Sequence, residues 1–233
     1  LDQIGTSRGT ANFSIRGLGI NSSIPSIDPT VGVFVDGVYL GINGGVVFDI
    51  FDVESVEILR GPQGVLFGRN VTGGAVLLNT SSPTEDFQGK VRAAVDGPID
   101  GGRGGENYTT SAVLTGPIIE DKLLFKVAGY YNNDRGYFEN QFDGSNFGAA
   151  ETYILRGALE ARLGDLTLTG KVDYFDSNGD GPAAQNRGIF ERDTFDFAID
   201  NAGFYDTEIL TTSLTAEWDI GPGTLTNILG YRD

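Results

Sequence analysis

The residues with chemical potential in this chain are arginines and carboxylates, because histidine and cysteine are both absent. Without them there are no Cys/His zinc ligands, no Ser-His-Asp triad, no thiol nucleophile and no disulfide. No catalytic or cofactor-binding residue can be named, so we expect neither an enzyme nor a bound cofactor. Sixteen basic against 32 acidic residues give a formal charge of -16, which argues against a nucleic-acid partner because such a protein needs a basic face.

Two short motifs begin like ligand sites but do not complete them. Asp176-x-Asn178-x-Asp180-Gly181 matches the start of a calcium loop, yet Arg187 stands where the loop requires glutamate. The glycine-rich stretch 101–105 is not followed by the Gly-Lys-Ser/Thr of a phosphate-binding loop. We therefore expect a solvated loop and a hairpin tip at these two places, and no metal site.

Glycines separate short apolar runs in the first 85 residues, which predicts short strands and tight turns. Asp36-Gly37 between two such runs is typical of a hairpin, because both central residues of a type I′ turn need positive φ. These features predict a small mixed α/β domain. Its expected strands are 13–15, 31–35, 38–40, 53–59 and 75–78, and its expected helices are 46–51 and 63–67.

The remainder of the chain alternates between apolar and polar residues, as a strand with two different faces does. Each segment is close to the roughly 9 to 11 residues that a tilted membrane strand needs, whereas no apolar run approaches the roughly 18 residues of a spanning helix. We expect seven strands, at roughly 87–97, 106–116, 122–132, 151–163, 165–176, 207–219 and 224–233.

The connections between these strands alternate in length. Those at 116–121, 164–165 and 220–223 are short, whereas 132–150 and 177–205 are long. Short turns on one side and long loops on the other are typical of an outer-membrane barrel. Tyrosines of lipid-facing parity are expected at the long-loop ends, with Phe87 and Trp218 at the opposite ends, as two interfacial girdles. These tyrosines are Tyr108, Tyr131, Tyr153, Tyr174 and Tyr231.

Three stretches of the first region carry a family resemblance. They are 15–19 (IRGLG), 31–39 (VGVFVDGVY) and 53–80 (VESVEILRGPQGVLFGRNVTGGAVLLNT). They closely resemble the plug domain of the TonB-dependent outer-membrane receptors. The later strands resemble the start of that family's barrel, and 116–131 (GPIIEDKLLFKVAGYY) is similar to its second periplasmic turn and third strand.

The resemblance implies a small mixed α/β plug domain followed by antiparallel transmembrane β-barrel strands, about seven of about 22. We expect the plug at 1–85 and the N-terminal part of the barrel at 86–233. The chain starts inside patterned sequence at Leu1 and stops in mid-strand at 230–233. We therefore expect both domains to be truncated, with the segment that binds TonB upstream of Leu1.

Members of this family carry scarce nutrients across the bacterial outer membrane, most often ferric siderophores. The resemblance therefore implies three partners: TonB with its inner-membrane energising complex, a small ligand such as a ferric siderophore, and outer-membrane lipid. Two alternatives stay open. One is a surface receptor or signal transducer of the same family, and the other is a secreted soluble β-protein that binds glycans, since alternation alone fits both settings.

Charged residues are the expected contacts between plug and barrel. Plug arginines need acceptors, and the resemblance implies that they meet carboxylates at inward parity on the wall. Bonds to plug backbone carbonyls are the equally open alternative. The residues concerned are Arg16, Arg60 and Arg69 on the plug and Glu160, Asp173 and Glu217 on the wall; the motif glycines Gly61, Gly64, Gly68, Gly73 and Gly74 are expected to allow sharp reversals.

The two long connections hold many aromatic residues, too many for plain solvated connectors. We expect these loops to face outward and to capture ligand, while packing against a neighbouring loop is equally compatible with the sequence. The candidates for ligand contact are Tyr137, Phe138, Phe142, Phe190 and Phe195, and the same loops also hold Phe147, Phe197 and Phe204.

Overall fold

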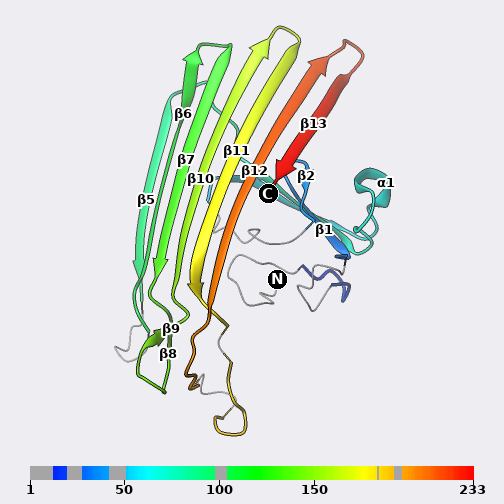
Figure 1. Ribbon diagram of the computed structural model, residues 1–233. Coiled ribbons are helices and arrows are strands. Elements are labelled where there is room, and N and C mark those ends of the chain that lie inside the picture. The colour runs from blue at the N-terminus through cyan, green and yellow to red at the C-terminus, as the bar shows by residue number, and fades with distance from the viewer. Residues whose placement is uncertain (1–12, 20–27, 42–50, 98–103, 183, 192–195) are drawn as a thin grey trace.

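The computed structural model describes residues 13–19, 28–41, 51–97, 104–182, 184–191 and 196–233. Their strands form a four-stranded sheet in the first part of the chain and a seven-stranded sheet in the second, and the smaller sheet lies against one face of the larger (Figure 1). We refer to them as the plug sheet and the wall. A short hairpin of β8 (Phe138–Glu139) and β9 (Asn146–Phe147) lies in one of the long connections of the wall.

The plug sheet is mixed, as expected for a small α/β domain. Its order is β2-β1-β4-β3; β1 and β4 are parallel, and the other pairs are antiparallel. The run 13–15, expected as a strand, forms only an isolated bridge between Ile15 and Leu18. The expected helix at 46–51 lies almost wholly outside the described residues. The elements are β1 (Val31–Val35), β2 (Val38–Tyr39), β3 (Val53–Arg60), α1 (Gly64–Phe67) and β4 (Gly74–Thr80).

Two backbone positions show why the plug motif needs its residue types. Asp36 and Gly37 have φ of 48° and 80° and join β1 to β2 with Val35 opposite Val38, which confirms the expected two-residue hairpin. Gly74 has φ of 149°, and a Cβ there would lie 2.3 Å from the Leu59 carbonyl oxygen. Only glycine fits this approach between β3 and β4.

Both faces of the plug sheet are packed. Val33 and Leu40 are fully buried on one face, and Phe34, Val71 and Ala75 form a cluster on the other. The short helix α1 covers the second cluster through Phe67, whose ring centroid is 4.9 Å from that of Phe34. Burial of β1 and β4 on both faces explains their nearly continuous apolar runs.

The wall confirms the seven expected strands, all antiparallel, in the order β13-β12-β11-β10-β7-β6-β5. One expectation is wrong: Asp176, Asn178 and Asp180 lie on a strand rather than in a loop, because β11 extends to Asp180. No group of three metal-binding side chains occurs among the described residues. The strands are β5 (Gln88–Asp96), β6 (Asn107–Ile119), β7 (Leu123–Asp134), β10 (Ala150–Leu163), β11 (Leu166–Asp180), β12 (Phe204–Asp219) and β13 (Thr224–Arg232).

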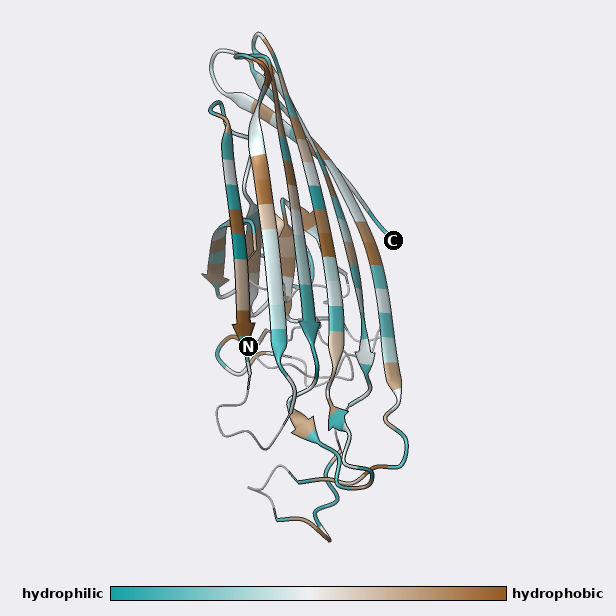
Figure 2. Ribbon diagram, turned by 90° about the vertical axis from the view of Figure 1, so that its left-hand side faces the viewer, coloured by the Kyte–Doolittle hydropathy of each residue, from teal (hydrophilic) through white to brown (hydrophobic). Residues whose placement is uncertain are grey.

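The alternation of the wall strands separates an inner from an outer face. On β7, Lys126, Ala128 and Tyr130 are buried on the face toward the plug, while Val127 between them is exposed. On β10, Leu155 and Leu159 are exposed in the same way, and apolar and polar residues alternate along the strands (Figure 2). Across the part of the chain that the structure describes, no helix has the length and hydrophobicity needed to span a membrane.

The outer face carries the expected tyrosines near the long connections. The rings of Tyr131 and Tyr153 lie 4.8 Å apart, and both hydroxyls donate to the Glu151 carboxylate, at 2.8 and 2.9 Å. Tyr231 departs from the expectation, because it pairs with Thr212 near the middle of β12. The girdle at this end therefore does not include Tyr231.

We predict that residues 1–233 expressed alone will aggregate or require detergent. β5 and β13 are the two edges of the wall, so each presents unpaired backbone groups, and the outer face is apolar. Size-exclusion chromatography with and without detergent tests this, with residues 1–85 as the control expected to need less detergent. A monodisperse, detergent-free monomer with a full β-sheet circular dichroism signal would contradict the prediction.

Candidate functional site

Three cations on neighbouring wall strands face the plug, and we call them the cationic clamp: Lys126 on β7, Arg156 on β10 and Lys171 on β11. The strand register places Lys126 and Lys171 on opposite sides of Ala158, and Arg156 lies two residues before Ala158. Inward parity and adjacent strands thus bring the three charges together on the wall. Each of them contacts the plug.

Lys171 holds the hairpin turn of the plug. Its Nζ lies 2.7 Å from Asp36 Oδ1 and also donates to the Thr80 hydroxyl at 2.9 Å. Asp36 in turn accepts hydrogen bonds from the backbone N–H and the hydroxyl of Thr80, at 3.0 and 2.8 Å. The lysine therefore binds the turn after β1 and the end of β4 at a single point.

Lys126 forms an almost completely buried ion pair with the plug. Its Nζ lies 2.7 Å from Asp52 Oδ2, and the two side chains are 3% and 2% exposed. The ammonium also donates to the backbone carbonyl and the hydroxyl of Ser81, and that hydroxyl donates to Asp52. Burial of both charges is tolerable only because each is paired and hydrogen-bonded.

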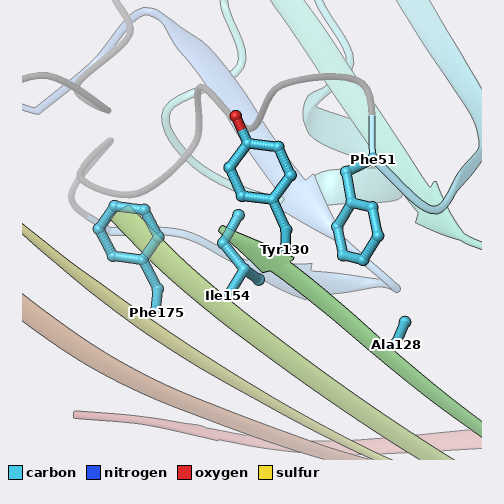
Figure 3. Packing of buried hydrophobic residues seen from close by; sticks show 5 residues of the cluster. All are labelled: Phe51, Ala128, Tyr130, Ile154 and Phe175. Atoms are coloured by element: carbon cyan, nitrogen blue, oxygen red, sulfur yellow. The ribbon is translucent and has the colours of Figure 1, made fainter. Parts of the chain in front are cut away.

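Arg156 combines a polar and an apolar contact with the plug. Its Nη1 donates to the Phe51 carbonyl at 2.7 Å, and its guanidinium lies 5.6 Å from the centroid of the Phe51 ring. That ring joins a small cluster of wall side chains from β7, β10 and β11 (Figure 3). The cluster comprises Phe51, Ala128, Tyr130, Ile154 and Phe175.

A second apolar contact is made at the plug hairpin and β13. A Cβ on Gly37 would lie 2.6 Å from Ile228 Cδ1, and a Cβ on Gly230 would lie 2.5 Å from Val38 Cγ2. Each glycine thus leaves room for the apolar side chain opposite. The hairpin is held by Lys171 on one side and fits closely against β13 on the other.

The segment that connects β4 to β5 also forms polar contacts with the wall. The Thr84 backbone N–H donates to the Thr115 hydroxyl at 3.0 Å. Arg162 pairs with Glu85 at 2.6 Å and with Glu160 at 2.8 Å. Polar contacts therefore continue from the plug sheet along the connection to β5.

The contacts have the opposite polarity to the expected ones. Wall cations bind plug carboxylates and carbonyls, while two of the wall carboxylates chosen from the sequence pair with wall arginines: Asp173 with Arg156, at 2.6 Å, and Glu160 with Arg162. The third, Glu217, is exposed, and its side chain forms no hydrogen bond or ion pair with another described residue.

The plug arginines Arg16, Arg60 and Arg69 are exposed, and none of them pairs with a wall carboxylate within the described ranges. Their role in holding the plug stays a prediction. The contacts expected from the sequence included neither the wall cations Lys126, Arg156 and Lys171 nor the plug aspartates Asp36 and Asp52, which resemble ordinary turn residues. Both aspartates have positive φ, 48° and 55°, but only that of Asp36 was expected from the sequence, through the Asp36-Gly37 turn.

The motif glycines divide into two groups. Gly61, Gly68 and Gly74 have positive φ, as sharp reversals require. Gly64 begins α1, and a Cβ on Gly73 would lie 3.2 Å from the Thr30 carbonyl oxygen. Gly73 is therefore needed for close packing and not for its backbone angle.

The two long connections of the wall are joined by Asn140, which is 3% exposed. Its Nδ2 donates to the Ile199 carbonyl at 2.8 Å, and its Oδ1 accepts from the Ile199 N–H at 3.0 Å. The Gln141 N–H donates to the Phe197 carbonyl at 3.0 Å, and the Phe197 ring meets that of Phe147 at 5.0 Å. The loops thus form one packed unit.

The aromatic candidates for ligand contact are placed differently within this unit. Phe138 packs against the Phe197 ring at 6.1 Å, whereas Tyr137 and Phe142 are each 64% exposed. Phe190 is half-buried, and Phe195 lies outside the described residues. At the tip of the β8–β9 hairpin, hydrogen bonds from the Ser145 hydroxyl and N–H hold the pKa of Asp143 below its ordinary value, so this tip stays anionic.

The first region of the chain matches a known protein family. Residues 2–75 match the family described as the TonB-dependent receptor plug domain. The pesticin receptor of Yersinia pestis is 30% identical over 136 residues, which cover 58% of this chain and 19% of the relative. The ferrioxamine B receptor of Salmonella typhimurium is 28% identical over 185 residues, covering 77% of this chain and 23% of the relative.

Solved structures of receptors have a fold similar to that of this chain. The ferric yersiniabactin uptake receptor FyuA from Yersinia pestis superposes with a TM-score of 0.78 at 21% identity, covering 97% of this chain and 35% of that chain. The chain spans about a fifth of the length of the curated relatives it matches. These relatives are receptors and not enzymes. Residues 2–75 therefore match the TonB-dependent receptor plug domain, and the chain as a whole is similar in fold to the plug and early barrel strands of the TonB-dependent outer-membrane receptors.

Proposed function

We propose that the complete protein imports a ferric siderophore or a similar metal chelate across the outer membrane, energised by TonB. The relatives named for ferrioxamine B and for ferric yersiniabactin uptake support this class of ligand. We also propose that residues 1–85 are the plug and residues 86–233 the first part of the barrel. β4 ends at Thr80 and β5 begins at Gln88, so this boundary falls in the connection between them.

The observation that carries the proposal is the polar character of the contact between plug and wall. The cationic clamp holds the plug by ion pairs and hydrogen bonds, and the apolar contacts beside it are two small ones, around Phe51 and between the hairpin and β13. Water can replace polar partners, whereas separating a large apolar interface exposes surface that water rejects. A plug held in this way can be displaced from the wall and can return to the same position, as an importer requires.

Uptake of defined chelates tests the function. A strain lacking the receptor gene is supplied with 55Fe complexed to ferrioxamine B, pyoverdine or yersiniabactin, and accumulated iron is counted with and without the restored gene and with and without TonB. We expect restoration for at least one chelate, and only when TonB is present. Binding without uptake would favour a surface receptor or signal transducer instead.

The clamp gives a sharper prediction in the complete receptor. Lys171→Met leaves the Asp36 carboxylate buried without its cation, at a cost of about 3 kcal/mol to plug docking. We expect the plug to unfold at lower urea concentration and large antibiotics to leak through the barrel, while the barrel stays folded by heat-modified electrophoretic migration.

Lys122→Met, at an exposed turn, is the matched control and should leave both properties unchanged. Asp36→Asn combined with Lys171→Met should recover part of the loss, because asparagine tolerates positive φ and carries no charge. Wild-type leakage and urea midpoint in Lys171→Met would show that this ion pair does not retain the plug.

The loop unit also predicts a measurable effect. Asn140→Leu removes both hydrogen bonds to Ile199 and leaves the half-buried N–H and carbonyl of Ile199 without these partners, at about 1 kcal/mol. We expect faster proteolysis within 184–201 and roughly tenfold weaker binding of the chelate identified by uptake. Gln141→Leu, whose side chain is exposed on the same turn, is the control. Equal affinity in both variants would remove the loop unit from ligand binding.

A further inference from the structure

A cavity of about 840 Å³ lies between the plug and the first three wall strands. On the wall side it follows β5 and β6 along their length, from Gln88 and Thr115 near the short turns to Asp96 and Asn107 near the long connections. On the plug side it is bounded by 51–53 and by residues between Ser81 and Thr84. The plug therefore leaves a continuous space beside this part of the wall.

The residues that line this space include more cations than acids. It contains the cations Lys90, Arg92 and Lys126 and the acids Asp52 and Asp96, in a chain whose formal charge is -16. Lys126 and Asp52 neutralise each other at 2.7 Å. Neither Lys90 nor Arg92 forms an ion pair or side-chain hydrogen bond with another described residue.

Spacing along β5 decides the net effect of the remaining charges. Lys90 and Arg92 are two residues apart on the same face, about 7 Å, so their potentials add. Asp96 lies four residues beyond Arg92, about 13 Å, which exceeds the screening length of about 8 Å at physiological salt. At mid-depth the cavity is therefore positive.

We propose that this cavity is a water-filled passage along the plug and that Lys90 and Arg92 favour anions in it, so that the imported chelate presents anionic groups. The inference rests on the proposed import function for its ligand, but the passage itself is a property of the chain. Rings of lysine and arginine select anions in other pores through the same electrostatics.

Cysteine labelling in the complete receptor tests the passage directly. Residues 1–233 contain no cysteine, and any cysteine elsewhere in the complete receptor is first replaced by serine, so that the introduced one is the only thiol. Ala94→Cys places the thiol on the inner face, two residues from Arg92, and Ala93→Cys places it on the outer face as the matched control. The probes are ethyl methanethiosulfonates with a sulfonate or a trimethylammonium group, with rates corrected by those of a free thiol.

We expect Ala94→Cys to react at least tenfold faster than Ala93→Cys, because a thiol in hydrocarbon does not ionise. The ratio of the anionic to the cationic rate at Ala94→Cys should fall about threefold to tenfold when Lys90→Gln and Arg92→Gln are added, and should not change with Lys122→Gln.

Two results would overturn the inference. Equal rates at positions 93 and 94 would show that water does not reach the cavity, and an unchanged anion-to-cation ratio would show that the two cations do not select charge. Labelling needs neither ligand nor TonB. A receptor that labels as expected but imports no ferric chelate would refute the proposed function and leave the passage intact.

Discussion

The ion pairs of Lys126 with Asp52 and of Lys171 with Asp36 are the interaction on which the relation of plug to wall depends. Each joins residues far apart in the chain, and the Lys126–Asp52 pair is almost completely buried. Such a pair adds little net stability, because desolvation offsets most of the attraction, but removal of one partner is costly. The clamp therefore determines where the plug sits more than how strongly it is held.

Contacts that are mainly polar suit a domain that must stay in place and still be able to move. The apolar contacts of the plug with the wall are small: the Phe51 cluster and the close fit of the hairpin against β13. The plug sheet has its own packed faces, so its internal stability does not come from the wall. A force applied to the plug can break the polar contacts one after another without first unfolding the barrel.

The plug contacts the wall differently on its two sides. On the side of β10 to β13, Arg156, Lys171 and the hairpin bring the plug into contact with the wall. On the side of β5 and β6, polar residues face the 840 Å³ cavity and two cations stay unpaired within the described residues. One side of the plug is thus anchored, and the other is bordered by a polar space.

Most elements and the faces of the wall strands follow from the amino-acid sequence alone. A period of two residues assigned inward and outward parity along the wall, and the short turn at Gly164-Asp165 fixes the β10–β11 register that puts Asp173 opposite Arg156. That neutralising pair was therefore predictable, although it was not predicted. The hairpin at Asp36-Gly37 followed from local backbone preference. Which plug carboxylate meets which wall cation does not follow from the sequence, because Lys171 and Asp36 are 135 residues apart and their contact depends on how two separately folded sheets dock.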